Sequence, residues 1–269
     1  MKKKLIVSGC SFTDKNFESL TAPDFDCSFS KWPELLAEKL DMECINLAFS
    51  GAGNNFIYST LLEEIIRTPK DEIGLVIAAW SQTNREDYQV RVSEKTSLKN
   101  VSFIDKHNDK FIWKNKRIGR QGDVFYWIKD TLRYYITFET LCKKHNLPYK
   151  QFQMINPFMG FLNGLSKTDW EIEENKHNPN YKKRYRYYPK TDNDKLECLK
   201  LLIEYEKYID IKNFIGWPTV ESLGGYDIEE KSLMIEERQN DKDLIVSDLD
   251  LHPNKKGHEK IAEFLYGRL

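Results

Sequence analysis

The stretch KLIVSGCSFT, residues 4–13, opens the chain with a short apolar run that stops at a glycine. Lys4–Ser8 has an apolar centre without polar alternation, which is typical of a parallel strand buried on both faces. Gly9 ends this run, and Ser11 follows in the turn. A serine in a turn after a strand has an exposed hydroxyl, and the backbone N–H groups of the turn can face a bound oxygen. The stretch therefore predicts the first strand of a parallel sheet with a reactive side chain at its carboxyl end.

Strands and helices alternate along the rest of the chain. The further predicted strands are Glu43–Ala48, Ile73–Trp80 and Tyr149–Ile155. The predicted helices are Trp32–Leu40, Phe56–Arg67, Val124–His145, Asp192–Ile209 and Asn254–Leu269. Because strands that alternate with helices form parallel sheets covered on both faces, this order predicts an α/β fold, a three-layer α/β/α sandwich with a parallel central sheet.

Two segments do not fit this alternation, although a chain of 269 residues is within the range of one decorated α/β domain. Short apolar patches broken by polar residues predict a hairpin insertion at about 86–122. The second insertion, at about 163–191, is polar and aromatic, and it contains the run YKKRYRYY at 181–188. Such a run can stack on sugars or bases, but a solvated loop over the sheet edge is the favoured interpretation. We expect a single domain over 1–269.

Charge and cysteine content exclude several classes of protein. Lys and Arg number 41 against 42 Asp and Glu, so the net charge of −1 provides no general attraction for nucleic acid or anionic membrane. The five cysteines show no paired C-x-x-C spacing, which argues against a disulfide framework and a zinc site. The first apolar run is too short for a signal peptide, and no run reaches the ~18 residues of a membrane span. We expect a soluble, cytoplasmic protein without a metal or cofactor.

The motif DLHP, residues 250–253, precedes the last predicted helix. Pro253 suits the first turn of that helix and leaves His252 in an extended loop, where an imidazole that titrates near neutrality can act as a general base. Asp250 is two residues earlier, so in an extended strand its carboxylate lies on the same face as the imidazole and can orient it. Asp248 is the alternative acid. A distant histidine and acid of this kind, paired with Ser11, predict a hydrolase.

Small and polar residues also follow the second and third predicted strands. Gly51 comes after the second strand, where glycine lets the backbone approach a substrate oxygen and present its N–H; Gly53 is the alternative. The third strand ends in SQTN, residues 81–84, where a side-chain amide can supply a further hydrogen-bond donor. Ligands of open α/β sheets bind beyond the carboxyl ends of the strands. The three strand ends therefore predict one common site.

With these motifs in this order, the chain resembles the SGNH hydrolases, also called GDSL-type esterases and lipases. That family has a nucleophilic serine in a Gly-Asp-Ser motif after the first strand, then a glycine, an asparagine in a Gly-x-Asn motif, and Asp-x-x-His near the C-terminus. Ser11, Gly51 and the His252-Pro253 pair match this pattern. Cys10 replaces the first aspartate, which performs no chemistry in the family, and Asp250 is one residue closer to the histidine than the family spacing.

The third block departs further, because Trp80-Ser81-Gln82 occupies the place of Gly-x-Asn. By register Gln82 takes the asparagine position, with Ser81 and Asn84 as alternatives. The resemblance implies a serine esterase with Ser11, His252 and Asp250 as catalytic triad. It also implies an oxyanion hole formed by the N–H groups of Ser11 and Gly51 together with Gln82, and no cofactor.

The resemblance leaves the substrate open, because the family acts on lipids, acetylated sugars and thioesters. Two aromatic residues, Trp80 and Trp217, are candidates for substrate binding in a protein that acts on a small-molecule or glycan ester. Trp217 and the insertion rich in Tyr and Arg favour a carbohydrate ester, such as an O-acetyl group on a carbohydrate. A second hypothesis is a binding or structural module of the same fold without turnover, motivated by the altered third block. A third, nucleic-acid binding through 182–190, is disfavoured by the near-neutral net charge.

Overall fold

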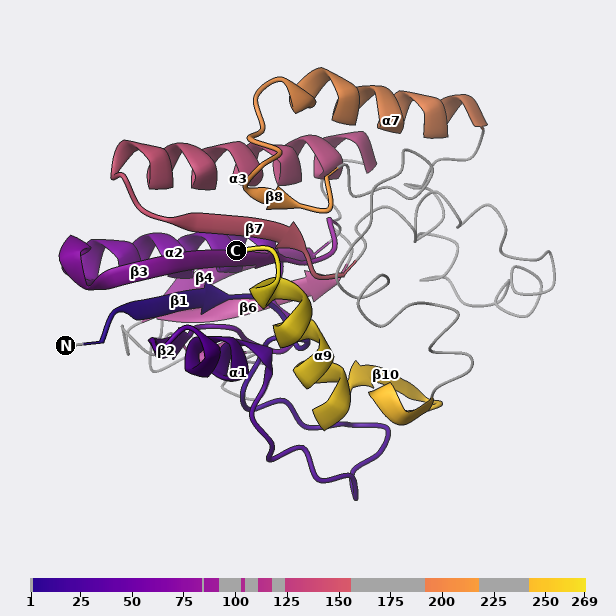
Figure 1. Ribbon diagram of the computed structural model, residues 1–269. Coiled ribbons are helices and arrows are strands. Elements are labelled where there is room, and N and C mark those ends of the chain that lie inside the picture. The colour runs from indigo at the N-terminus through magenta and orange to yellow at the C-terminus, as the bar shows by residue number, and fades with distance from the viewer. Residues whose placement is uncertain are drawn as a thin grey trace, which may run out of the picture.

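The computed structural model describes residues 2–83, 85–91, 103–104, 111–117, 124–155, 192–217 and 242–269. Its central sheet has five strands in the order β2-β1-β3-β7-β8, and every pair of neighbours is parallel (Figure 1). The strands are β1 (Lys4–Ser8), β2 (Glu43–Asn46), β3 (Ile73–Trp80), β7 (Tyr149–Gln153) and β8 (Phe214–Ile215). The first strand of the sequence thus lies inside the sheet, with β2 at one edge and β8 at the other.

Helices cover both faces of this sheet, which confirms the predicted α/β/α sandwich. One layer contains α1 (Trp32–Lys39) and α9 (Lys255–Tyr266), and the other contains α2 (Asn54–Arg67), α3 (Val124–Lys144) and α7 (Asp192–Glu206). Figure 1 shows α3 and α7 on one side of the strands and α1 and α9 on the other. Two short 3-10 turns, η1 (Lys70–Glu72) and η6 (Lys242–Leu244), precede β3 and β9.

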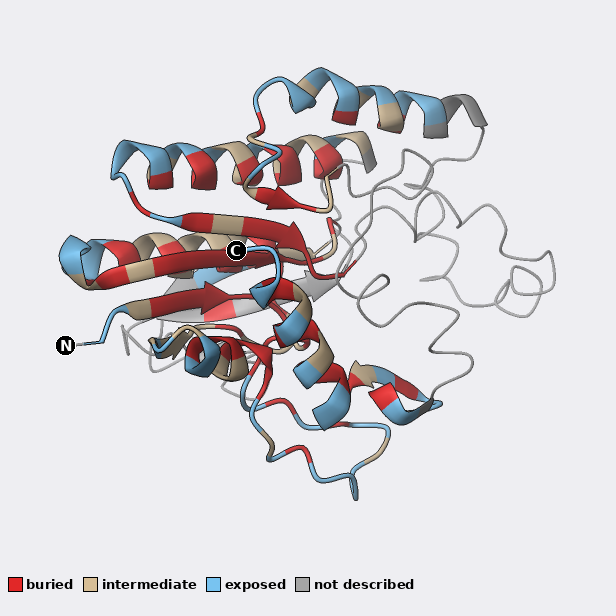
Figure 2. Cartoon of the chain, in the orientation of Figure 1, coloured by how far each residue is buried: buried red, intermediate tan, exposed pale blue. Residues whose placement is uncertain are grey.

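The apolar strands are buried because alternate side chains enter two different cores. Leu5 and Val7 pack in the core under α1 and α9, whereas Ile6 packs in the core under α2 and α3. In β3, Leu75 and Ile77 likewise face the first core, and their neighbours face the second. Figure 2 shows the central strands as almost continuously buried. A run that is apolar at every position is therefore what a strand between two helical layers requires.

Three short strands were not predicted. β8 has only two residues, and β9 (Ile245–Ser247) forms an antiparallel pair with β10 (Asp250–Pro253). Segments of two to four residues are too short to display a period, so a sequence pattern cannot reveal them. The predicted strands Glu43–Ala48 and Tyr149–Ile155 also ran two residues too far, because β2 ends at Asn46 and β7 ends at Gln153. The loop after β2 contributes Ser50 and Gly51 to the site described below.

The first predicted insertion contains an antiparallel sheet. Its strands are β4 (Arg85–Arg91), β5 (Phe103–Ile104) and β6 (Phe111–Arg117), in the order β4-β6-β5. Trp113 of β6 packs its ring against Phe56 of α2, with centroids 5.3 Å apart, which attaches this sheet to the main core. The second predicted insertion, 163–191, lies outside the described residues, as does the basic segment 182–190. Among the helices of the described ranges, none has the length and apolarity to cross a bilayer.

Candidate active site

The turn after β1 holds Ser11 at the carboxyl edge of the sheet. The carbonyl of Cys10 accepts hydrogen bonds from the N–H groups of Thr13 (2.9 Å) and Asp14 (3.0 Å), so the chain reverses tightly around Ser11. A loop follows this turn and continues to α1. The side chains of this loop contact β9 and β10, and these contacts hold it in place.

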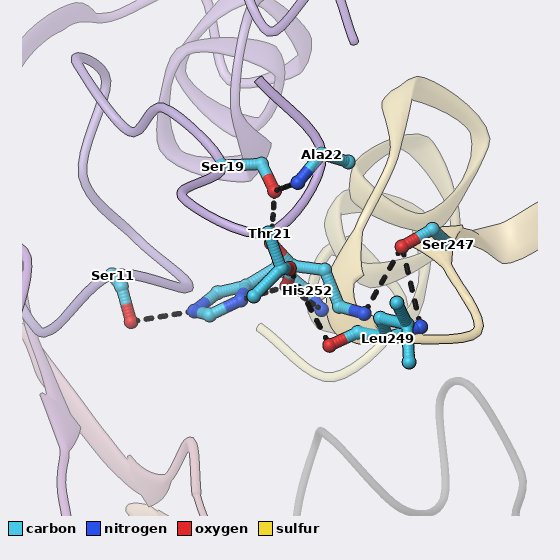
Figure 3. Close-up of polar contacts among 8 residues, drawn as sticks. Ser11, Ser19, Thr21, Ala22, Ser247, Leu249 and His252 are labelled. Atoms are coloured by element: carbon cyan, nitrogen blue, oxygen red, sulfur yellow. Dashed lines mark hydrogen bonds and ion pairs between the residues drawn. The ribbon is translucent and has the colours of Figure 1, made fainter. Parts of the chain in front are cut away.

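Ser11 and His252 meet although 241 positions separate them. The Oγ of Ser11 lies 2.8 Å from Nε2 of His252, and Nδ1 of the same ring lies 2.5 Å from Oδ1 of Asp250 (Figure 3). An ionised carboxylate can only accept a hydrogen bond, so Nδ1 carries the ring proton and the lone pair of Nε2 faces the Ser11 hydroxyl. The three side chains form one continuous hydrogen-bonded line.

The short strand β10 positions both the acid and the imidazole. Asp250 and His252 are alternate residues of this strand, so their side chains lie on the same face. Oδ1 of Asp250 also accepts a hydrogen bond from the backbone N–H of His252 (3.1 Å), and Oγ of Ser247 accepts one from the N–H of Asp250 (3.1 Å). Asp248, the alternative acid, is exposed in the turn between the two strands. The geometry thus brings Asp250 to the ring.

Ser19 is a member of this network that sequence reasoning missed. Its hydroxyl donates to Oδ2 of Asp250 over 2.5 Å, and its oxygen accepts from the N–H of Ala22 over 2.9 Å (Figure 3). With Ser19 on Oδ2 and His252 on Oδ1, both carboxylate oxygens have a partner. A loop serine in a polar stretch carries no local signal, so only the packing of this loop on β10 could identify it.

The surroundings of His252 favour the neutral imidazole. Phe12 and Phe17 pack on the ring, with centroid distances of 4.4 and 4.2 Å. Burial lowers the pKa of His252; the hydrogen bond and charge of Asp250 oppose this shift, and the charge of Arg85 adds to it. Burial alone would raise the pKa of Asp250, but hydrogen bonds from Ser19 and His252 outweigh it and the net pKa is lowered. A neutral base beside an ionised carboxylate is the arrangement that general-base chemistry requires.

The turn after β2 joins the same site through Asp14. Oδ2 of Asp14 accepts hydrogen bonds from both the N–H and the hydroxyl of Ser50, each over 2.8 Å, which ties the first loop to the second. Gly51 follows with a φ of +86°, a left-handed conformation that favours glycine. Gly53, the alternative, donates its N–H to Oδ1 of Asp87 over 3.1 Å, so that donor is already engaged.

A cavity of about 530 Å³ opens in front of Ser11. Ser11, His252 and Asp250 line it together with Ser50 and Gly51. The remaining wall is mainly apolar, with Phe12, Phe17, Leu20, Leu249 and Leu251 beside Glu18 and Thr21. The leucines at the mouth stay uncovered, since Leu20 is 95% exposed and Leu249 is 82% exposed. The Ser11 side chain therefore borders an open space with a mainly apolar rim.

The third block contributes little to this cavity. Ser81 is wrong as an oxyanion donor, because the residue is fully buried and its backbone N–H donates to Oδ1 of Asn54 over 2.8 Å. Asn84 lies outside the described residues. Gln82 is half-buried and is not among the residues that line the cavity, so its role as a third donor remains a prediction.

The two candidate tryptophans also lie away from the Ser11 cavity. Trp80 is wrong as a substrate contact: its side chain is 0% exposed, packs against Tyr135, and donates from Nε1 to Oε1 of Gln151 over 3.1 Å. Its position in β3, on the same face as Val76 and Ala78, explains this burial. Trp217 follows β8 at the far edge of the sheet and donates to Oε2 of Glu206 over 3.0 Å. It does not line the cavity.

Among the residues that the structure describes, no three His, Cys, Asp or Glu side chains are grouped so that they could hold a metal ion. Cys10, the neighbour of Ser11, is a free cysteine and is buried.

Comparisons with protein families and with curated proteins give no match. Several solved structures are similar. A lipolytic protein of the G-D-S-L family from Desulfitobacterium hafniense has a TM-score of 0.49 and 13% identity, with 99% of each chain covered. The psychrotrophic esterase EstA from a Pseudoalteromonas species has a TM-score of 0.45 and 12% identity, over 99% of this chain and 96% of that chain.

A carbohydrate esterase of family 2 from Corynascus thermopiles, which also has a carbohydrate-binding domain, gives a TM-score of 0.44 and 12% identity. The match covers 99% of the present chain and 65% of that chain. Along nearly its whole length, the chain is thus similar in structure to lipolytic proteins and esterases, among them members of the G-D-S-L family.

Proposed function

We propose that this protein hydrolyses carboxylic esters with Ser11 as nucleophile, His252 as general base and Asp250 as the acid that orients the base. The observation that carries the proposal is the unbroken line of hydrogen bonds, 2.8 Å from Ser11 to His252 and 2.5 Å from His252 to Asp250. A nucleophile, a base and an orienting group in this geometry define a catalytic triad by their roles, whatever their order in the chain.

The reaction proceeds by acyl transfer. Oγ of Ser11 attacks the ester carbonyl carbon while Nε2 of His252 takes the hydroxyl proton. The imidazolium then returns this proton to the leaving alcohol as the carbon–oxygen bond breaks, which leaves an acyl group on Ser11. Water, deprotonated by His252, attacks the acyl carbon; the bond to Ser11 breaks, Oγ of Ser11 takes the proton back from the imidazolium, and the carboxylic acid is released. Asp250 stays ionised and stabilises the transient positive charge on the ring.

The proposed oxyanion donors are the backbone N–H groups of Ser11 and Gly51. Ser11 is supported by its place in a tight turn at the carboxyl end of β1, and Gly51 by its place in the cavity wall beside it. One such donor is typically worth ~3–4 kcal/mol of transition-state stabilisation. Two donors without a third therefore predict an enzyme that is slower than one with three donors, but still active.

Within this class we propose an O-acyl group on a carbohydrate as the substrate. The apolar wall of the cavity, with Phe17 and the leucines at its mouth, suits a short acyl group. The alcohol part of the ester must then lie outside this wall, toward the polar residues beyond Gly51. The competing hypothesis of a binding module without turnover is favoured by one observation, the burial of Ser81, an alternative to Gln82 as the third donor.

The test combines covalent labelling with turnover. A fluorophosphonate probe should label the native protein. The native protein should also release acetate from 4-nitrophenyl acetate and from an acetylated xylan. Ser11→Ala should lose both the labelling and the release of acetate. Ser28→Ala, which removes an exposed serine of the same loop, is the matched control and should behave as the native protein. A folded native protein that neither labels nor releases acetate would support the binding module. Equal activity of native protein and Ser11→Ala would exclude Ser11 as nucleophile.

A further inference from the structure

A second cavity, of about 450 Å³, lies where the N-terminus of α2, the start of β4 and the first turns of α3 meet. Polar and aromatic side chains dominate its wall, among them Asn55, Thr83, Arg85, Tyr126, Asp130 and Tyr134. None of these residues lines the cavity of Ser11. The proposed triad makes no use of this space.

Two hydrogen-bonding atoms in this wall have no partner within the described part of the chain. They are Oγ1 of Thr83 and Nε of Arg85, and both atoms are buried. Thr83 as a whole is only 6% exposed. Arg85 is fixed by its Nη1, which donates to the carbonyl of Ala52 over 3.2 Å. Buried polar groups without partners are unfavourable, and both of these atoms belong to residues that line the cavity, so a ligand bound there would be the partner that they lack.

The charges of the wall indicate which ligand fits. Three acidic residues, Glu86, Asp87 and Asp130, accompany Arg85 in the wall, and Asp130 also lies 3.8 Å from Arg133, so no excess positive charge favours an anion. Asp87 is already engaged, because its carboxylate accepts the N–H groups of Gly53 and Phe56 at the start of α2. A neutral ligand that both donates and accepts hydrogen bonds can use Arg85, Thr83 and Asp130 together.

Aromatic side chains complete this set of groups. Tyr126 and Tyr134 line the same cavity, and Tyr126 is partly exposed, so its ring is accessible to a bound molecule. Flat rings beside groups that donate and accept hydrogen bonds suit the apolar faces and the hydroxyls of a sugar ring. The cavity therefore fits a neutral polyhydroxylated molecule better than an apolar chain or an anion.

Arg85 also connects this cavity to the triad. Its partner Ala52 is the neighbour of Gly51, which lines the cavity of Ser11. The positive charge of Arg85 contributes to the lowered pKa of His252, so the guanidinium acts electrostatically on the imidazole. The turn that contains Gly51 and Ala52 thus lines the Ser11 cavity at Gly51 and contacts Arg85 of the second cavity at Ala52.

We propose that the second cavity is the sugar-binding subsite of this protein, in which Thr83 Oγ1 and Arg85 Nε hydrogen-bond the hydroxyls of a neutral carbohydrate. This inference rests on the proposed function for its role in catalysis, since the sugar would be the alcohol part of the ester cleaved at Ser11. Binding itself does not require turnover and can be measured on a protein that lacks Ser11.

The test measures binding of simple sugars to Ser11→Ala by saturation-transfer NMR. The probes are the methyl glycosides of glucose, galactose, mannose and xylose, and inorganic phosphate serves as the anion probe. At least one glycoside should bind with Kd below about 20 mM, and phosphate should not, since contacts of a few groups give millimolar affinity. Absence of binding by all four glycosides, or binding of phosphate alone, would overturn the proposal.

Thr83→Val in the Ser11→Ala background is the decisive variant. It keeps the shape of the side chain and removes a hydroxyl that has no partner in the protein, so the melting temperature should stay the same or rise. Binding of the glycoside should weaken about fivefold, since one hydrogen bond to the ligand is lost. A purely structural residue would not produce loss of binding together with unchanged stability.

Arg85→Met and Thr137→Val complete the design. Arg85→Met should weaken glycoside binding about tenfold or more, as expected for a lost hydrogen bond from a charged donor. Thr137→Val makes the same chemical change as Thr83→Val on an exposed position of α3 and should leave binding unchanged. Glycoside binding that neither Thr83→Val nor Arg85→Met alters would place the sugar elsewhere and overturn the assignment.

The result also separates this inference from the proposed function. If the fluorophosphonate probe labels Ser11 but no glycoside binds, the esterase stands and the subsite fails. If a glycoside binds through Thr83 and the probe does not label, the subsite stands and the protein is a carbohydrate-binding module rather than an enzyme.

Discussion

The hydroxyl of Ser19 donates a hydrogen bond to Oδ2 of Asp250, over 2.5 Å and across 231 positions of the chain. The other carboxylate oxygen, Oδ1, receives both the ring and the backbone N–H of His252. Asp250 is therefore held from two sides, by the loop after β1 and by its own strand. Ser19 does not face the proposed reacting atoms, so its expected role is to position the acid.

Ser19→Ala should lower kcat about tenfold and leave KM nearly unchanged. Loss of a hydrogen bond to a charged group costs ~1.5–3 kcal/mol, and part of this cost should appear as a less well-oriented imidazole. Ser19→Thr keeps the hydroxyl and should restore most of the rate. Steady-state kinetics with 4-nitrophenyl acetate measures both. Ser28→Ala, which changes an exposed serine of the same loop, is the control; an equal loss there would point to general loosening of the loop.

Asp250→Asn should reduce kcat by roughly 10³–10⁴-fold while the protein stays folded. An amide can donate to Nδ1 and so favour the imidazole tautomer in which Nε2 carries the proton, which cannot accept the proton of Ser11. Asp248→Asn changes an exposed carboxylate two residues away and should retain nearly full activity. Comparable losses in both variants would contradict the assignment of Asp250 as the orienting acid.

The pH dependence of kcat/KM should reflect the environment of His252. Burial lowers the pKa of His252, and only the neutral ring can act as base, so the rate should rise with pH through a midpoint below 6.5 and be at its plateau by neutrality. Arg85→Met removes a positive charge that lowers this pKa and should move the midpoint upward. A midpoint above 6.5 in the native protein would mean that Asp250 outweighs burial.

Gly51→Ala should impair both stability and turnover. A side chain at φ +86° costs ~1–2 kcal/mol, although an added Cβ would meet no atom within 4 Å, so the penalty comes from backbone conformation and not from a clash. Relief of this strain would shift the Gly51 N–H from its place in the cavity wall. Gly267→Ala, at a glycine with φ −70°, is the control and should keep the native melting temperature or raise it.

Stability at acidic pH should depend on His258. This side chain is buried, accepts the N–H of Trp32 at the start of α1, and has its pKa lowered to about 3, mainly by burial and then by the charge of Lys31. The unfolded chain therefore binds a proton more readily between pH 6.5 and 3, and the free energy of unfolding should fall as pH decreases through this window.

Urea titrations at pH 7 and pH 4.5 measure this effect. His258→Gln keeps an acceptor for Trp32 but cannot titrate, so its loss of stability between the two pH values should be smaller by ~2–3 kcal/mol. His145→Gln replaces an exposed histidine and should reproduce the native loss. An unchanged loss in His258→Gln would show that His258 does not contribute to acid sensitivity.

Local sequence patterns were sufficient for the layers of the fold. Lys4–Ser8 and Ile73–Trp80 occur as strands with the predicted bounds, because a run that is apolar at every position has a stable place only between two helical layers. The same pattern also predicts that Trp80 is buried, since Trp80 lies on the same face of the strand as Val76 and Ala78. Its proximity to a strand end nevertheless suggested a surface role.

The short strand β10 could not be predicted from such patterns. Its four residues carry no period, yet they set the common face of Asp250 and His252. Ser81 illustrates the opposite case, because its polarity suggested exposure while the packing of α2 against β3 turned its N–H toward Asn54. Apolar periodicity can be detected in the sequence around a residue. A hydrogen bond between distant segments cannot be predicted from the sequence around either partner.

The sequence by itself determined a parallel sheet between two helical layers and the chemical types present at the strand ends, because burial of apolar surface is encoded residue by residue. Only the tertiary structure decided that Ser11 lies 2.8 Å from His252, that Ser19 holds Asp250, and that Thr83 and Arg85 face a second cavity. These relationships arise from the packing of loops against one another, and the free energy of such packing depends on contacts between residues that are hundreds of positions apart.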